Sequence, residues 1–372
     1  MKPKFTSPIR KTFGRAIIPA GTFAILITHS MVHAGNTWDG GGGDDNWGTG
    51  NNWNPDGSPS PGSGNDLFFA GSTRLTPFNN YGAFDDWRNI TFNAGASSFN
   101  ITGSAIDLFG KIENLSSNTQ TVGLTSIALN SATANEFNPV NGNLTINSTN
   151  IFTNGNQLKV FGNNGFTLSF GSSSNIQQAG SLSINQNSTV VFNSAHSYSG
   201  DTFINAGKLQ FASGGSAANT TIRIGDTSGT VGAEFDLTSA TGGQSLANTI
   251  VSRLGGAGYA ARIIDSQNTS GTNALTGVIA LDAALTIKQA ALWEENTFDQ
   301  GTKILLDDWT NAELHVPMFA AERCFRQTAM YLCSCTTQPD SAGLYILTVQ
   351  PWNREGEQWQ KIPCRELLGK HK

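Results

Sequence analysis

Cysteine is absent between residues 35 and 288, and histidine occurs there once, as His196. A Cys–His nucleophilic pair is therefore excluded from this region, and a closed zinc site, which takes four nitrogen or sulfur ligands, is not expected. Serine is abundant, but no Gly-x-Ser-x-Gly nucleophile elbow occurs. The sequence therefore predicts no catalytic residue, no cofactor and no metal site.

Strong excess charge and long apolar runs are missing too. The chain carries 22 basic and 27 acidic residues, a net charge of −5, and no Lys/Arg cluster follows residue 34. Nucleic acid and anionic membranes are therefore not expected as partners. A membrane-spanning helix needs about 20 consecutive apolar residues, and no segment after residue 34 has such a run. The mature chain is thus predicted to have no transmembrane span.

Residues 1–34 have the pattern of a secretory signal peptide. A basic start is followed by a short apolar core at 16–27 and by small residues up to Ala34, where signal peptidase would cleave. An uncleaved anchor is the alternative, although the apolar core is shorter than a membrane span. We expect the mature chain to begin at Gly35 and to be secreted, extracellular or held at the outer cell surface.

Composition divides the mature chain after residue 288. Residues 35–288 contain 36 Gly, 33 Asn and only 25 charged residues, whereas residues 289–372 contain 4 Gly, 19 charged residues and all four cysteines. The first region is polar, but its low charge and its regularly spaced Val, Ile, Leu and Phe distinguish it from a disordered chain. We expect this region to fold.

A short unit recurs in the first region: Gly, one or two residues, Leu, a polar residue and a large apolar residue. Leu144 and Leu168 are 24 residues apart, as are Leu158 and Leu182, and Leu209 follows Leu182 by 27 residues. The copies are 142–146, 155–161, 165–170, 180–184 and 207–211, and the segments 232–237 and 277–287 continue the series.

Each copy alternates apolar and polar residues, as in a strand with one buried face, and Gly, Asn and Ser between copies suit corners. This repetition predicts an all-β fold, a parallel β-helix (β-solenoid). Residues 35–82 would form a Trp/Gly/Asn-rich N-terminal cap and residues 83–288 the repeats, with roughly eight turns after Ile90. A β-sandwich is the competing fold. Within the repeats, the spacing of apolar residues in 245–256 predicts one short helix.

The segment 198–213 resembles the autotransporter-associated β-strand repeat family, whose unit runs from an aromatic residue through a Thr-rich strand and an Asn-Ala-Gly corner to a Leu-centred strand. Phe203 departs from the pattern, because that position is usually small and polar. The matching residues are Tyr198, Gly200, Thr202, Ile204, Asn205, Ala206, Gly207 and Leu209. Residues 90–129 and 52–69 also resemble segments of such proteins, so the resemblance covers about 36–288. It implies a secreted, surface-displayed or released β-helical passenger.

Residues 38–54 combine three Trp with Gly, Asn and Asp and allow three interpretations. Residues 40–48 formally match a calcium-binding nonapeptide, which binds the ion only when copies stack in tandem. Alternatively, exposed Trp38, Trp47 or Trp53 would stack on sugars. The interpretation we favour is a cap, because bulky indoles would cover the apolar cross-section and the unpaired backbone groups at the end of a solenoid.

Glu234 and Asp236 are the best pair of carboxylates, since they flank an inward Phe235 and project from one outer face. Such a pair could supply the acid and base of a glycosidase. The alternative, which we favour, is a solvated strand face that discourages edge pairing. His196 is predicted to be a corner residue and not a catalytic base.

No enzyme is predicted from these residues. The leading function is that of a secreted or cell-surface structural or adhesive β-helical passenger, whose Asn/Thr/Ser ladders make weak, multivalent contacts with glycans or other cell surfaces. The alternative is a carbohydrate-binding or polysaccharide-cleaving β-helix.

Residues 289–372 lack the repeat, and we predict a tail of mixed or no stable structure. Apolar residues within 316–335 have helical spacing, and the helix would begin at Pro317. Residues 342–352 would suit one strand. The cysteines do not form two Cys-x₂-Cys pairs for zinc, and outside the cell they allow three disulfide pairings. A shifted reading frame or accidental fusion, a genuine small domain and a partner-binding extension are the open interpretations of this tail.

Overall fold

The computed structural model describes six ranges of the chain and three strands that follow them, all within one compact unit, His33–Lys372. The ranges are 35–133, 135–227, 230–238, 244–255, 260–266 and 273–289. The predicted signal peptide, the helix expected at 316–335 and the four cysteines lie outside the described residues.

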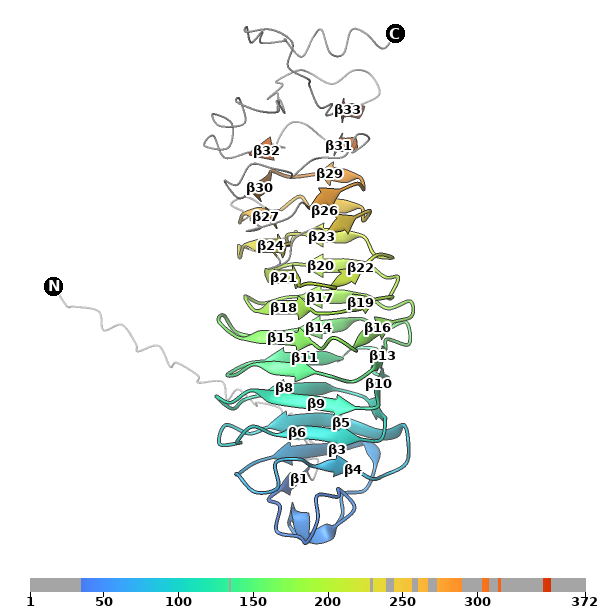
Figure 1. The fold of residues 1–372 in the computed structure, drawn as a ribbon, viewed down its shortest axis with the longest axis vertical. Helices are drawn as coiled ribbons and strands as arrows, with labels where there is room; N and C mark the ends of the chain where they lie inside the picture. The colour runs from blue at the N-terminus through green and yellow to red at the C-terminus, as the bar shows by residue number, and fades with distance from the viewer. Residues whose placement is uncertain are drawn as a thin grey trace, which may run out of the picture. The chain divides into compact units, whose positions relative to one another are not determined.

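The described residues are all-β apart from one short 3-10 helix, η1 (Gly50–Asn52), and they coil into a parallel β-solenoid of about nine turns (Figure 1). This confirms the predicted fold class. The competing β-sandwich is wrong, because each strand pairs in parallel with the corresponding strand of the next turn. A β-sandwich would instead pair neighbouring strands antiparallel. Each turn contributes strands to three sheets, which we name sheets 1, 2 and 3.

Sheet 1 stacks eleven strands in chain order. They are β4 (Phe78–Asn79), β6 (Asn100–Gly103), β9 (Gln120–Leu124), β12 (Leu144–Ile146), β15 (Thr167–Phe170), β18 (Thr189–Phe192), β21 (Gly207–Phe211), β24 (Ala233–Asp236), β27 (Arg262–Ser266), β30 (Leu285–Gln289) and β32 (Leu314–His315).

Sheet 2 starts on the first half of β5 (Asp85–Phe92) and consists of very short strands. They are β7 (Ile106–Leu108), β10 (Ser126–Leu129), β13 (Asn150–Phe152) and β16 (Asn175–Gln177), followed in later turns by the pairs β19 (Ala195–His196) with β22 (Ser216–Ala217) and β25 (Ser245–Leu246) with β28 (Ala274–Leu275).

Sheet 3 includes the second half of β5 and contains the first strand of the structure. Its other members are β1 (Gly35–Trp38), β3 (Gly62–Phe69), β8 (Lys111–Asn114), β11 (Glu136–Pro139), β14 (Leu158–Val160), β17 (Leu182–Ile184), β20 (Thr202–Ile204), β23 (Ile222–Ile224), β26 (Ile250–Ser252), β29 (Ile279–Leu281) and β31 (Lys303–Asp307). Two antiparallel strands flank it, β2 (Trp53–Asn54) on β1 and β33 (Leu344–Thr348) on β31.

The 24 strands from β6 to β29 form eight successive turns with one strand in each sheet, the number predicted from the repeat. The Leu-centred units stack as expected, with Leu168 directly over Leu144 in sheet 1 and Leu182 over Leu158 in sheet 3. Treating these leucines as one series was wrong, because they belong to two sheets. Leu209 pairs with Val190 of sheet 1 and not with a residue of sheet 3.

The interior is filled by side chains that alternate inward along every strand. Most stacked inward positions carry Leu, Ile, Val or Phe, and these side chains have little or no exposed surface. Thr202 and His196 are buried polar exceptions. Aromatic rings follow one another from turn to turn with centroids 5.0 to 6.3 Å apart, which suits edge-on and offset ring packing. The rings are those of Phe137, Phe170, Phe192, Phe211 and Phe235.

The helix predicted within 245–256 is wrong, because that segment contains strands β25 and β26. Leu246 and Ile250 are buried, as a helical stripe would also require, but Leu254 is 52% exposed. Strand β26 pairs in parallel with β23 on one side and β29 on the other. These ladder hydrogen bonds override a weak local helical pattern.

We expect Leu168→Ala to lower the free energy of unfolding by about 2–5 kcal/mol, because the leucine is fully buried between stacked turns. The change is measured as the urea midpoint followed by circular dichroism. Ser169→Ala is the matched control, since Ser169 is the next residue of β15 and points outward. Equal midpoints for the two variants would show that this column does not hold the turns together.

Candidate functional site

The three tryptophans of residues 38–54 close the first turn of the solenoid. Trp38, Trp47 and Trp53 have no exposed surface. Trp53 packs edge-on against Trp38 at 5.2 Å and donates its indole N–H to the Trp47 carbonyl at 2.7 Å, while Trp47 packs edge-on against Trp87 at 5.8 Å. The predicted cap is confirmed. Stacking of sugars on these three indoles is excluded, because their rings are covered.

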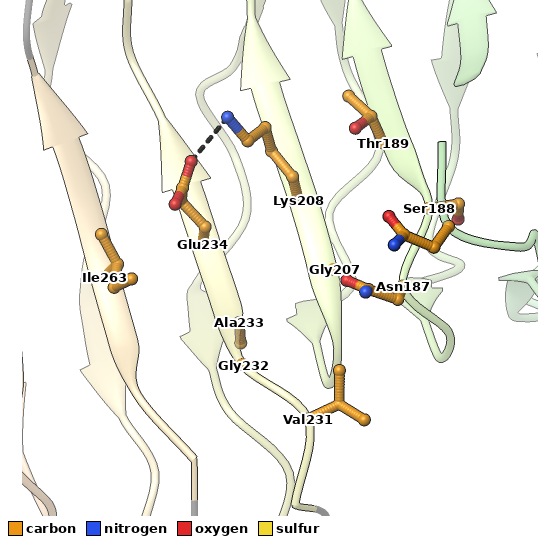
Figure 2. A pocket seen from close by; sticks show the side chains of 11 residues that line it. Asn187, Ser188, Thr189, Gly207, Lys208, Val231, Gly232, Ala233, Glu234 and Ile263 are labelled. Atoms are coloured by element: carbon orange, nitrogen blue, oxygen red, sulfur yellow. Dashed lines mark ion pairs between the residues drawn. The ribbon is translucent and has the colours of Figure 1, made fainter. Parts of the chain in front are cut away.

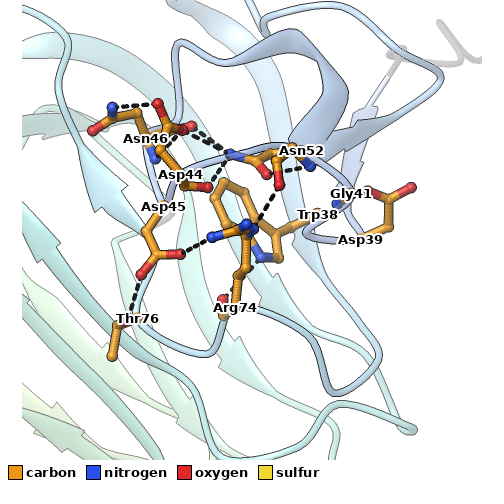
Figure 3. A network of polar contacts seen from close by, with 10 residues as sticks. Trp38, Asp39, Gly41, Asp44, Asp45, Asn46, Asn52, Arg74 and Thr76 are labelled. Atoms are coloured by element: carbon orange, nitrogen blue, oxygen red, sulfur yellow. Dashed lines mark hydrogen bonds and ion pairs between the residues drawn. The ribbon is translucent and has the colours of Figure 1, made fainter.

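The glycine-rich loop before η1 is held by a polar network (Figure 3). Arg74 forms an ion pair with Asp45 at 3.2 Å and donates to the Gly42 carbonyl at 2.8 Å. Thr76 donates to the other oxygen of Asp45 at 2.7 Å. The indole of Trp38 donates to the Arg74 carbonyl at 3.1 Å, so this network also fixes the cap.

The calcium interpretation assigns Asp45 as the ligand, whereas the structure shows this carboxylate bonded to Arg74 and Thr76. Its neighbour Asp44 accepts hydrogen bonds from the Asn46 backbone and side chain at 3.1 and 2.9 Å. A hydrogen bond from Thr49 is the main cause that lowers the pKa of Asp44. Across the described ranges, no group of three His, Cys, Asp or Glu side chains could hold a metal ion.

We expect Trp38→Ala to lower the free energy of unfolding by about 3–5 kcal/mol, since a fully buried indole leaves a large cavity. Loss of the cap should also increase self-association at the exposed strand edges. Urea unfolding measures the first effect and light scattering the second. Gly43→Ala serves as the control, because nothing lies within 4 Å of its added methyl group; equal behaviour of both variants would contradict the role of the cap.

Glu234 and Asp236 lie on the same face of β24, as predicted, and Phe235 between them is buried. The expected solvated strand face is wrong for Asp236, which is only 3% exposed. The Lys208 ammonium bridges them, at 2.6 Å from Glu234 and 2.8 Å from Asp236. Partial burial favours the neutral amine, but the hydrogen bonds to both carboxylates outweigh it and raise the pKa of Lys208 to about 12. Asp236 also accepts a hydrogen bond from the Thr238 backbone at 2.8 Å.

This bridge bears on the glycosidase alternative. An acid–base pair requires one carboxylic acid with a raised pKa and one ionised carboxylate. The ammonium group of Lys208 occupies a hydrogen-bonding position on each carboxylate that a substrate or a water molecule would need. The arrangement of Lys208, Glu234 and Asp236 therefore suits a fixed hydrogen-bonding surface better than proton transfer.

The sequence predicted His196 to be a corner residue, and this is wrong. His196 is a buried residue of β19. Its ring lies 3.9 Å from that of Phe192 and 5.5 Å from that of Phe170, and its Nδ1 accepts the backbone N–H of Ile176 at 2.9 Å. Burial lowers the pKa of His196 to about 3. Spacing alone did not reveal this, because a polar residue in a two-residue strand resembles a corner.

We expect the stability of the fold to decrease as the pH falls from 6.5 to 3. Below pH 6.5 the unfolded chain protonates His196, whereas the folded chain keeps it neutral until about pH 3. This difference in the pKa of His196 between the folded and unfolded chain lowers the free energy of unfolding by up to about 5 kcal/mol. Denaturant unfolding across this range, compared with His196→Gln, isolates the histidine from the carboxylates; parallel pH profiles would show that its folded pKa is not lowered.

A hollow of ≈ 330 Å³ lies on the outer face of sheet 1, beside the ion pair of Lys208 and Glu234 (Figure 2). Of its lining, the sequence singled out Glu234 as a candidate functional residue and Gly207 only as part of a repeat corner. Its lining residues are Asn164, Asn187, Ser188, Thr189, Gly207, Lys208, Val231, Gly232, Ala233, Glu234 and Ile263. No signal in the sequence could have found the others without the register between turns.

Comparison with known proteins finds no matching family model, no similar curated protein and no similar solved structure. Among the residues that the structure describes, no helix has the length and apolar character to span a membrane. The function must therefore be argued from the geometry of the solenoid itself.

Proposed function

We propose that this chain is a secreted or cell-surface structural and adhesive protein without enzymatic activity. Its stacked turns would present polar side chains for weak, multivalent contact with glycans or with other cell surfaces. The signal-like residues 1–34 and the resemblance of 198–213 to the autotransporter-associated repeat support the secreted location.

The observation that carries the proposal is the way in which outer polar side chains bond from turn to turn. On sheet 2, Gln177 donates to Asn150 at 2.9 Å, and Asn150 donates to Ser126 at 3.2 Å, so three successive turns are connected. At a nearby corner, Asn154 donates to Asn130 at 2.6 Å. The outer surface thus offers hydrogen-bonding groups at intervals of about 4.8 Å.

Such an array suits adhesion better than catalysis. Each amide or hydroxyl that already bonds to a neighbouring turn contributes little to binding a free ligand. Repetition of such groups along a rigid scaffold compensates for the weakness of each contact, because several weak contacts made at once multiply the apparent affinity.

The alternative is a polysaccharide-cleaving β-helix that uses Glu234 and Asp236. Their projection from one face favours it, whereas their shared contact with Lys208 disfavours an acid–base division of roles.

We expect the purified chain to be retained on polysaccharide-coated surfaces, with retention that rises steeply with coating density, and to release no reducing ends from the same polysaccharides. Surface-plasmon retention and a reducing-sugar assay measure the two properties. Glu234→Gln and the control Glu113→Gln, whose glutamate pairs with Lys111 at 2.8 Å, should both leave cleavage absent.

Cleavage by the wild-type chain that Glu234→Gln abolishes and Glu113→Gln retains would replace adhesion with the enzymatic alternative. Absence of retention on every surface tested would contradict adhesion to glycans.

A further inference from the structure

The hollow on sheet 1 is built from one row of side chains that crosses four successive turns (Figure 2). Thr189 of β18 pairs in register with Lys208 of β21, Lys208 with Glu234 of β24, and Glu234 with Ile263 of β27. Each step corresponds to about 4.8 Å, so the row extends for about 14 Å. A ligand in this hollow would touch several turns at once.

The charged groups of the row, taken together with Asp236 beside it, disfavour an anionic ligand. Lys208 contributes one positive charge, and Glu234 and Asp236, both bonded to its ammonium group, contribute two negative charges. The local net charge is therefore −1. Because a lysine ammonium has three N–H donors and two of them point to these carboxylates, the group is held in a fixed position beside the hollow.

A buried hydroxyl lies at the edge of the hollow. Ser188 is only 1% exposed, and its Oγ has no hydrogen-bond partner among the described residues. Buried polar groups are nearly always hydrogen-bonded, so an unsatisfied one requires an explanation. Ser188 lines the hollow, but its Oγ has almost no accessible surface, so the side chain would have to turn outward before a ligand hydroxyl could complete its hydrogen bonding.

The remaining lining combines small polar groups with aliphatic surface. Thr189 and Asn187 supply a hydroxyl and an amide, whereas Val231, which is 46% exposed, and Ile263 supply aliphatic contacts. Gly232 leaves the backbone uncovered between them. Neutral sugars have the matching chemistry, with hydroxyl groups around a ring that also presents C–H bonds.

We propose that this hollow is a binding subsite for a neutral hexopyranose unit of a glycan chain. The volume of ≈ 330 Å³ lies at the lower end of the range for small-molecule sites. The proposal rests on the glycan adhesion proposed above and assigns one site for it. Binding at one subsite is weak, because the described residues that line the hollow include no aromatic ring to stack on the sugar.

The test uses the purified chain with cellotetraose, maltotetraose and laminaritetraose as neutral probes and tetragalacturonate as the anionic comparison. Titrations by saturation-transfer NMR measure the affinity of each. We expect at least one neutral probe to bind and tetragalacturonate to bind more weakly.

Gly232→Leu fills the hollow and should weaken binding by about tenfold or more, since its added Cβ meets only the Ala261 carbonyl at 3.6 Å and the fold accepts it. Gly123→Leu is its matched control, because this glycine of β9 also has its nearest contact at 3.6 Å and lies outside the hollow. Thr189→Ala should weaken binding by about three- to tenfold, the value of one hydrogen bond.

Thr167→Ala is the control for Thr189→Ala, because Thr167 pairs in register with Thr189 one turn earlier and does not line the hollow. Both controls should bind as the wild type does. Binding that survives Gly232→Leu would place the sugar elsewhere and overturn this subsite, while adhesion to glycans would stand. Tighter binding of tetragalacturonate would overturn the assignment of a neutral sugar.

If no probe binds while the chain is still retained on polysaccharide surfaces, this subsite is wrong and the proposed function stands. If neither binding nor retention occurs, both proposals are wrong.

Discussion

The fold depends on one constraint, the register between successive turns. Parallel pairing places Leu168 over Leu144 and Leu182 over Leu158, so apolar residues stack in continuous columns. A shift by a single residue would turn every inward side chain of a strand to the surface. The same register aligns the polar side chains outside, so the packed interior and the polar outer surface have a common origin.

The cap solves the problem that this arrangement creates at its end. The backbone N–H and C=O groups of a stacked turn form hydrogen bonds with the turn above and the turn below, but the first turn has only one neighbour. Strand β2 pairs antiparallel with β1 at that edge, and the indoles cover the apolar cross-section. The Trp-rich segment is thus a structural requirement of the solenoid, which explains why its rings are not available to sugars.

The fold could be predicted from the sequence where local pattern and stacking agree. The unit at 207–211 coincides with β21, because its alternation and its corner glycine both indicate a strand. The helix predicted at 245–256 was wrong, because the apolar spacing there suits a helix and a pair of short strands equally. Only the pairing with neighbouring turns decides between the two.

The site was less predictable for a related reason. The row Thr189, Lys208, Glu234 and Ile263 joins residues separated by 19, 26 and 29 positions. No fixed spacing connects them, so the lysine that bridges the two carboxylates was invisible without the register. The burial of His196 likewise depends on rings contributed by adjacent turns.

The unequal lengths of the turns have an evolutionary consequence. In sheet 1, stacked positions are 19 residues apart between Val190 and Leu209 and 29 apart between Phe235 and Ile264, yet pairing continues without interruption. Extra residues are accommodated at the corners, outside the ladder. Insertions and deletions there can remodel the outer surface without disturbing the interior, so the scaffold can persist while its surface diversifies.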